Sequence, residues 1–316
     1  MPNKLLRSNR QIVKDTITTN TVTSGLLTPG QAKKFLKQTF DATPLMGAIR
    51  HVTKTERKSE IDKIGVDRRL LRRKIENVDD GYRAKPKFGQ IEYSCNPVRL
   101  PWEITEDTLR ENIEGENLDK LVTDLMTTQI GVDQEDLLIN GDEATPATDP
   151  DYDFLKLDDG VIKKISTGGH VMDVTGATDM ELDMFYKTVS MVPGRFLNNG
   201  RFRWLMSPTR AQQWELFLLK KVLNAGGAVP ESLYNSPVAI PSMQVPSLSD
   251  DKIILADPMN IVLVNTYNMK IRKDATSKDA IMQDKRFYVV HFDLDTLIEE
   301  LDATAIITGL PAYSFN

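Results

Sequence analysis

The chain has 316 residues, of which 40% are hydrophobic, so it is long enough to bury one or two cores. Its formal net charge of −5 excludes a general polyanion binder, and its single cysteine excludes an intramolecular disulfide and a CxxC metal or redox motif. No run approaches the roughly 18 apolar residues that a membrane helix needs, and the first residues lack the apolar centre of a signal peptide. We therefore expect no membrane partner.

The N-terminal region is predicted to be an extended arm that ends in a short helix. Residues 1–28 are polar, rich in Thr, Ser and Asn, and have no helical period. Thr28 is a plausible N-cap for a helix over 28–43, and Pro29 suits its first turn. The apolar residues of this helix share one face: Phe35, Leu36 and Phe40. Because no core lies next to them in the sequence, we expect this face to dock elsewhere.

Residues 48–102 alternate between apolar and polar positions in the manner of β-strands. Two such runs flank a basic stretch, and the segment "NVDDGYRAKPKFG" between them supplies turn residues. The middle of the region contains few large apolar residues, so it cannot build a core of its own. We predict a long two-stranded excursion that is marginally stable alone and needs a partner surface.

The strongest helical pattern lies between residues 105 and 141. Thr105 is a suitable N-cap, and the acidic Glu106 and Asp107 favour the helix dipole in the first turn. Past Gly115, apolar residues keep an approximate helical spacing: Leu118, Leu121, Val122, Leu125, Ile130, Leu137 and Leu138. Gly141 can close the C-terminus. A helix over 117–140 would be roughly 36 Å long, which is the length of a structural spine.

Beyond a loop region at 142–180, the pattern becomes that of an α/β region. Residues 180–193 and 207–223 have helical periodicity, with a strand-like run at 202–208 between them. Further strands are predicted at 252–257, 260–266, 269–274, 285–295 and 303–310. The predicted fold class of the whole chain is α+β.

The basic stretch stands out in a chain that is otherwise acidic. From His51 to Gln90 there are twelve Lys and Arg against seven Asp and Glu, which gives this segment +5 and leaves −10 for the rest. Its densest part consists of Arg68, Arg69, Arg72, Arg73 and Lys74. Between Asp67 and Pro86, Tyr82 is the only aromatic residue available for base stacking, and acids are mixed into the stretch. A protein–protein contact is therefore favoured over a nucleic-acid site or a solvated face.

Residues that carry catalysis or metal binding are sparse. The three histidines, His51, His170 and His291, are isolated in the sequence, and no glycine-rich segment has the spacing of a phosphate-binding loop. The segment 149–160 alternates aspartates like a calcium loop, but it has Phe where that loop requires Gly and Gly where it requires a bidentate Glu. We therefore predict no catalytic, cofactor-binding or metal site, and no enzyme activity.

The order of these elements resembles the major capsid proteins of tailed bacteriophages, which have the Hong Kong 97 fold. Glu103 to Leu109 match the strand that precedes the family's spine helix, and Leu137 to Asp142 match the helix end "ll.GdG", with Glu143 where the family often has Gly. "RWLMSPTRAQQWELF", "YNSPVAIPSMQVPS" and "IILADPMNIVLVNTYNMKIRKD" are similar to later family segments in the same order. The resemblance covers most of the chain from Leu100 on, and the basic excursion fits by position.

The resemblance implies a shell subunit with five segments. They are an N-arm (1–48), an extended β-hairpin E-loop (49–99), a P-domain with the spine helix and a β-sheet (100–180), an α/β A-domain (181–285) and return strands of the P-domain (286–316). In this family the E-loop lies across a neighbouring subunit. The basic residues of the E-loop and the three apolar residues of the N-arm would then contact other subunits, with charge complementarity setting their register more than their affinity.

The resemblance also implies a structural protein of the virion capsid, assembled in the host bacterial cytoplasm. Its subunits would form hexamers and pentamers of an icosahedral shell around double-stranded DNA, which the inner face would meet without sequence specificity. No long charged helical segment precedes the fold, so we expect a separate scaffolding protein and retention of residues 1–25 on the mature subunit. A portal protein and a decoration or cement protein are further partners that the family implies.

Two other functions compete with this one. An encapsulin, the shell protein of a bacterial nanocompartment with the same fold, usually lacks a long N-arm, so the Thr-rich arm and the long basic excursion favour the phage protein. An α/β hydrolase or metal enzyme on an unrelated fold would need a cluster of acid, base or ligand residues. The scarcity of His and Cys argues against it.

Overall fold

The computed structural model describes residues 43–66, 70, 71, 73, 79, 81–111, 117–197, 200–224, 236–266 and 270–312. The predicted helix over 28–43 and its apolar residues Phe35, Leu36 and Phe40 lie outside these residues, apart from position 43 itself. None of the described helices is long and apolar enough to cross a membrane.

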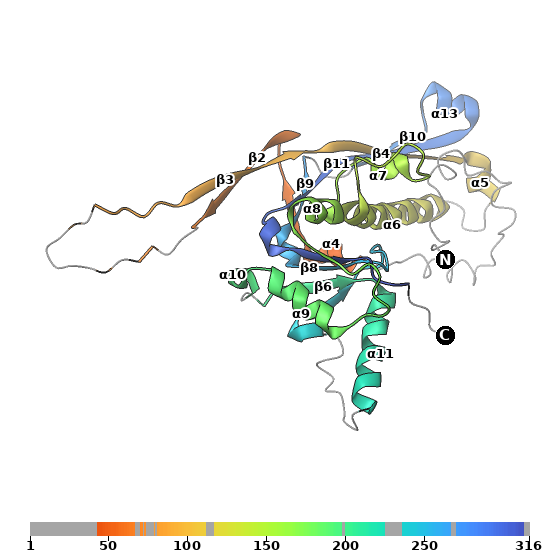
Figure 1. The fold of residues 1–316 in the computed structure, drawn as a ribbon. Helices are drawn as coiled ribbons and strands as arrows, with labels where there is room; N and C mark the ends of the chain where they lie inside the picture. Colours follow the sequence, from red (N-terminus) through yellow and green to blue (C-terminus); the bar gives the residue numbers. More distant parts are fainter. Residues whose placement is uncertain are drawn as a thin grey trace.

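The described elements form four layers (Figure 1). A first β-sheet lies on one side of α6 (Asn117–Asn140) and α8 (Val161–Gly168), and a second β-sheet lies on their other side. Helices α9 (Leu182–Met191) and α11 (Pro208–Asn224) cover the outer face of the second sheet. The predicted α+β class is confirmed.

Helix α6 is the predicted spine helix, and its bounds match the prediction. Its 24 residues give a length of roughly 36 Å, and its inward face contributes Val122, Leu137 and Leu138 to the main core. The short helix α5 (Glu106–Glu111) precedes it and is capped as predicted, because the Thr105 hydroxyl accepts a hydrogen bond from the backbone N–H of Thr108 at 3.3 Å.

The first sheet is organised by β11 (Lys285–Ile298), which is long enough to pair with three strands. Its first ten residues pair antiparallel with β4 (Asn96–Thr105), and β10 (Lys270–Asp274) pairs along its other edge. Its last four residues pair with β9 (Ile261–Asn265), and β1 (Arg50–Thr53) continues the sheet parallel to β9. Trp102 and Tyr288 stack across the β4–β11 pair with ring centroids 5.3 Å apart.

The second sheet has the strand order β5-β12-β8-β6-β7. Its strands are β5 (His170–Asp173), β6 (Arg203–Met206), β7 (Ser242–Gln244), β8 (Ile253–Ala256) and β12 (Ala305–Thr308). Ile254 and Ile306 face the core around α6, whereas Leu255 and Ile307 face α9 and α11. Because both faces are covered, β8 and β12 are continuous apolar runs rather than alternating ones.

The predicted two-stranded excursion is a β-hairpin that projects from the body (Figure 1). Strands β2 (Lys58–Gly65) and β3 (Lys87–Ser94) pair antiparallel from Lys58↔Ser94 to Gly65↔Lys87. The remaining described elements are short: α4 (Pro44–Ala48), α7 (Tyr152–Leu155), α10 (Gly194–Leu197), α13 (Lys278–Gln283) and the 3-10 helices η2 (Pro237–Ala239), η3 (Pro258–Asn260) and η4 (Leu301–Ala303).

The two sheets do not follow the segment bounds expected from the sequence. Strand β5 lies in the expected P-domain segment but joins the second sheet, as does β12 from the return segment. Strands β9 and β10 lie in the expected A-domain segment but belong to the first sheet. Each sheet thus draws on several segments, and the division into five segments stays a prediction.

Candidate inter-subunit surface and the root of the hairpin

One face of the hairpin packs against the body. Ile61 and Ile91 lie opposite each other and contact a small core formed by Tyr93, Cys95, Val262, Val264 and Leu297. Lys63 is on the same face, where its ammonium pairs with Glu300 and donates to the backbone carbonyl of Glu299 at 3.1 Å. The base of the hairpin is therefore part of the subunit's own fold.

The other face of the hairpin is exposed. Ile64 and Phe88 lie opposite each other and are 68% and 69% exposed. Further toward the body on the same face, Glu60 lies directly opposite Glu92, an arrangement of like charges that destabilises an isolated pair of strands. The exposed apolar pair makes the outer half of this face the candidate contact surface of the hairpin.

The predicted contact residues lie in the connection between β2 and β3. Arg68, Arg69, Arg72 and Lys74 are outside the described residues, and Arg73 is described as exposed. Leu71, next to them, is 98% exposed. The role of the basic residues between subunits stays a prediction.

Charged side chains, three of them buried carboxylates, gather where the hairpin joins the first sheet. We call this cluster the hairpin root: Arg57, Asp158, Lys164, Asp293 and Asp295. The aspartates Asp158, Asp293 and Asp295 are only 3%, 1% and 6% exposed. A carboxylate buried to this degree requires hydrogen bonds, a cation or a proton.

Asp295 connects three elements of the root. One of its oxygens accepts a hydrogen bond from the backbone N–H of Ser94, at the end of β3, at 2.6 Å. Its other oxygen lies 3.4 Å from the ammonium of Lys164 on α8, which also donates to the backbone carbonyl of Thr296. The hairpin, β11 and α8 therefore meet at this carboxylate.

Asp158 and Asp293 bring two more segments to the root. Asp158, in the loop between α7 and α8, accepts from the backbone N–H of Thr296 at 2.7 Å. Asp293 accepts from the backbone N–H of Thr266 at 2.7 Å and from its hydroxyl, and it lies 3.8 Å from Nε of Arg57 in the β1–β2 turn. Three carboxylates thus face two cations.

This excess of carboxylates shifts protonation equilibria in the root. Burial raises the pKa of Asp158 to about 7; Lys164 opposes the shift and the charge of Asp295 adds to it. Burial, with the charges of Asp293, Asp295 and Asp158, raises the pKa of the Cys95 thiol to about 12. The thiol therefore stays protonated at neutral pH, which makes it a poor nucleophile.

Close packing of the backbone explains why a glycine follows the spine helix. A Cβ at Gly141 would lie 2.2 Å from the backbone carbonyl oxygen of Asp158, so only glycine fits without displacing the backbone. The backbone N–H of Gly160 donates to the Gly141 carbonyl at 2.8 Å, and Asp142 pairs with Lys163 at 2.9 Å. The "GD" at the helix end therefore fixes the loop that carries Asp158.

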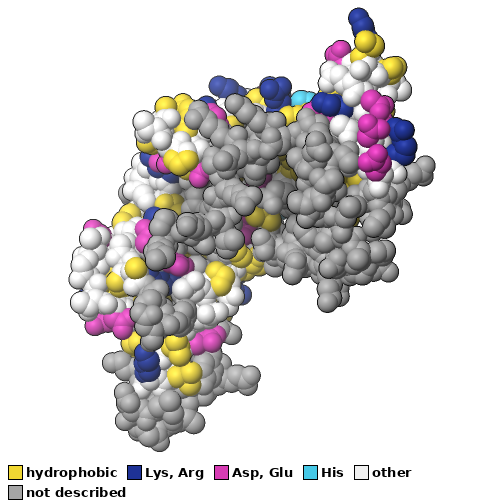
Figure 2. All heavy atoms as spheres, turned by 90° about the vertical axis from the view of Figure 1, so that its right-hand side faces the viewer, with side chains coloured by type: hydrophobic (Ala, Val, Ile, Leu, Met, Phe, Trp, Pro, Cys, Tyr) yellow, Lys and Arg dark blue, Asp and Glu magenta, His cyan; other side chains and the backbone are white. Residues whose placement is uncertain are grey.

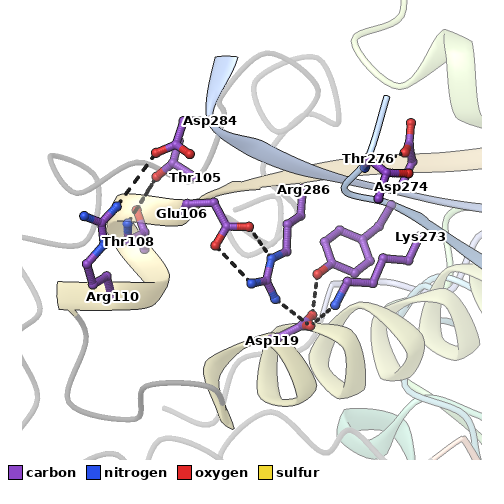
Figure 3. A network of polar contacts seen from close by, with 11 residues as sticks. Thr105, Glu106, Thr108, Arg110, Asp119, Lys273, Asp274, Thr276, Asp284 and Arg286 are labelled. Atoms are coloured by element: carbon purple, nitrogen blue, oxygen red, sulfur yellow. Dashed lines mark hydrogen bonds and ion pairs between the residues drawn. The ribbon is translucent and has the colours of Figure 1, made fainter. Parts of the chain in front are cut away.

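A second polar network holds the start of the spine helix to the first sheet (Figure 3). Arg286 on β11 forms a bidentate pair with Glu106 and lies 3.5 Å from Asp119, which also accepts from the Tyr288 hydroxyl at 2.5 Å and from Lys273. Burial alone would raise the pKa of Asp119, but the hydrogen bonds from Lys273 and Tyr288 outweigh it and lower that pKa. This network positions α5 and α6 on the sheet.

The projecting end of the first sheet also has exposed apolar residues. Ile281 and Met282 on α13 are both strongly exposed. Figure 2 views the molecule from this side and shows hydrophobic and charged side chains mixed at the tip. Its mixed character contrasts with the apolar pair on the hairpin.

The three histidines lie on three different strands. His51 on β1 donates to the backbone carbonyl of Met46 at 2.8 Å, His170 begins β5 in the second sheet, and His291 is in the middle of β11. Within the described part of the chain, no group of three His, Cys, Asp or Glu residues is arranged to hold a metal ion.

Sequence reasoning did not find the hairpin root. Its members come from separate places in the chain, so no motif marks them. A signal was available in "FDLD", where Asp293 and Asp295 alternate with apolar residues in the buried half of β11. A charged residue within a buried strand must be compensated by a partner from elsewhere in the fold.

Known proteins share this architecture. The chain is 28% identical to the putative prophage capsid protein YqbE of Bacillus subtilis (strain 168), over 96% of this chain and 98% of the relative. No family model matches it. Among solved structures, a chain of the satellite phage P4 procapsid that includes the size determination (Sid) protein matches with a TM-score of 0.61 at 14% identity, covering 98% of this chain and 97% of the other.

The shared fold extends to a bacterial nanocompartment. A chain of the holo-SrpI encapsulin complex from Synechococcus elongatus PCC 7942 matches with a TM-score of 0.59 at 11% identity, covering 99% of this chain and all of the other (100%). These comparisons confirm the resemblance to tailed-phage capsid proteins and the Hong Kong 97 fold.

Proposed function

We propose that this chain, which has the Hong Kong 97 capsid fold, is a phage major capsid protein that assembles into the hexamers and pentamers of an icosahedral shell. The observation that carries the proposal is similarity over nearly the whole chain to a relative named as a putative prophage capsid protein. The likeness in fold to a phage procapsid subunit, again over nearly the full length, supports it.

The geometry of the hairpin supports a role in assembly. Its base packs on the subunit's own core, but its outer half has an exposed apolar pair and leads into the basic connection. A neighbouring subunit that covers this half would remove the apolar pair from water and bring a predominantly acidic surface to the arginines.

An encapsulin shell is the second candidate, and the match to the SrpI complex favours it to the extent that the fold is shared. The phage function is preferred because the similarity to YqbE is detectable in sequence as well as in fold.

The further partners follow from the phage function. We propose a separate scaffolding protein during assembly, a portal protein at one vertex, a decoration or cement protein outside and double-stranded DNA inside, bound without sequence specificity. Assembly would take place in the bacterial cytoplasm and the product would be the virion capsid, in which the chain has a structural role.

Negative-stain electron microscopy of the purified full-length protein, with light scattering over a range of concentrations, tests the proposal. We expect closed shells or capsomer rings. A monomer at every concentration would contradict a shell function. Shells isolated from the producing cell that contain DNA would support the phage protein, and shells filled with a cargo protein would support the encapsulin.

The basic residues of the hairpin can be tested in the same assay. Replacing Arg68, Arg69, Arg72 and Arg73 by Glu should abolish or strongly reduce shell yield while circular dichroism stays unchanged. Single exposed ion pairs contribute only about 0–1 kcal/mol, but four reversals are repeated at every subunit contact. The matched control replaces the same four residues by Lys and should assemble. Normal shells in the Glu variant would mean that the arginines form a solvated face.

A further inference from the structure

The hairpin root does not balance its charges internally. Its two cations compensate the three buried carboxylates incompletely, because the side chain of Arg57 is 57% exposed and lies 3.8 Å from Asp293, where water screens the pair. Lys164 acts on both remaining carboxylates, since it contacts Asp295 and its charge opposes the rise in the pKa of Asp158. One cation thus serves two buried acids.

We propose that the hairpin root is a proton-operated joint: a proton on Asp158 fixes the base of the hairpin to the body, and losing it as the pH rises loosens that attachment. The attachment is direct, because Asp295 holds the last residue of β3 through the Ser94 N–H. Asp158 holds the adjoining residue of β11 through the Thr296 N–H.

The charged and titratable groups around Asp158 and Asp295 come from four places in the fold. Lys164 approaches from α8, Asp293 from β11, Arg57 from the β1–β2 turn and Cys95 from the β3–β4 junction. The Cys95 thiol stays neutral at the pH values concerned, so the two cations and three carboxylates of the root carry a formal net charge of −1 when Asp158 is ionised. A proton cancels this charge.

The direction of the pH effect follows from the raised pKa. In the folded subunit the pKa of Asp158 is about 7, against an ordinary value of 3.8, so the folded state binds a proton that the opened state has lost. The stabilisation from this proton is greatest at acid pH and is lost as the pH rises through 7. The joint is therefore tight at pH 6 and loose at pH 8.

The joint goes beyond the proposed function and does not depend on it, because it concerns how one subunit holds its own hairpin. Its consequence for a shell is that the direction of the hairpin responds to pH before any contact between subunits changes. The direction of the hairpin would change with pH whether the partner surface is neutral or acidic.

Hydrogen exchange of the Ser94 and Thr296 amides in the full-length protein tests the joint. After correction for the intrinsic rate, and with one assembly state held at both pH values, both amides should be about tenfold better protected at pH 6 than at pH 8, since the protonated fraction falls from roughly nine tenths to one tenth. Equal protection at the two pH values would overturn the proposal.

Asp158→Asn supplies the decisive comparison. The amide oxygen can still accept from Thr296 but carries no charge, so protection should be high and equal at pH 6 and pH 8. The control Asp183→Asn changes an exposed acid on α9 that pairs with Lys187 outside the hairpin root, and the tenfold ratio should persist. A ratio that persists in Asp158→Asn would overturn the assignment.

An infrared measurement on the wild-type protein covers the case in which Asp158→Asn does not fold. The infrared C=O stretching band of a protonated carboxyl group should appear as the pH is lowered from 8 to 6. Its absence over this range would overturn the joint without use of any variant.

Discussion

The second sheet and the hairpin are both β-structure, yet they are completed in different ways. Strands β8 and β12 are buried on both faces, between the core around α6 on one side and α9 with α11 on the other. Strands β2 and β3 have one neighbour each, and only one face of the pair packs on the body. The subunit itself covers both faces of β8 and β12, whereas it leaves one face of the hairpin exposed.

The difference separates two kinds of mutational effect. A substitution of a buried side chain in the second sheet or the spine should change the unfolding free energy of the subunit, because that side chain packs in the subunit's own cores. A substitution on the exposed face of the hairpin should leave that free energy almost unchanged and appear only in assembly. The predictions below test this separation, from the largest expected effect on the unfolding free energy to the smallest.

Leu138→Ala in the spine helix should have the largest effect. The side chain is almost fully buried in the main core, so its truncation should lower the unfolding free energy of the subunit by about 2–5 kcal/mol. Urea denaturation of the unassembled protein measures this. Leu71→Ala, at a fully exposed position of the hairpin, is the control and should change nothing measurable. Equal decreases in the two variants would remove the distinction between body and hairpin.

Gly141→Ala should have an intermediate effect. The added methyl group would meet the backbone of Asp158 at 2.2 Å, so the loop before α8 must move, at a cost typical of overpacking, about 1–3 kcal/mol. Gly194→Ala is the matched control, because a Cβ there meets nothing within 4 Å. The urea midpoint of Gly141→Ala should be lower than that of Gly194→Ala. An unchanged midpoint in Gly141→Ala would show that the loop moves aside without an energetic cost.

The sequence predicts the elements of this fold better than the contacts between them. The spine helix follows from the spacing of Leu118, Val122 and Leu137, and the buried strands follow from unbroken apolar runs such as 253–256. These patterns are local. The pairing of β1 with β9, which joins positions more than two hundred residues apart, has no local signature.

The same limit applies to the site. The hairpin was predictable because its strands and turn residues are consecutive, and its lack of a core of its own was visible in the composition. The hairpin root was not, since Arg57, Asp158 and Asp295 become neighbours only when separate parts of the chain close on one another. Its charge balance is a property of the folded chain, and the excess carboxylate appears in no single segment.

The smallest effect on the unfolding free energy, and the one that separates the two regions most sharply, is expected for Ile64→Ser combined with Phe88→Ser. The two side chains lie opposite each other on the exposed face, so the variant mainly removes their packing on one another, which is worth less than about 1 kcal/mol. In a shell the same pair should be covered by a neighbour, and the substitution recurs at every copy. We expect a subunit with a near-normal urea midpoint and a severely reduced shell yield by electron microscopy.

Met259→Ser, at an exposed apolar position of η3 outside the hairpin, should assemble normally. Normal shells from the double variant would show that the exposed face of the hairpin stays in solvent after assembly, and the contact would then have to be sought at the basic connection alone.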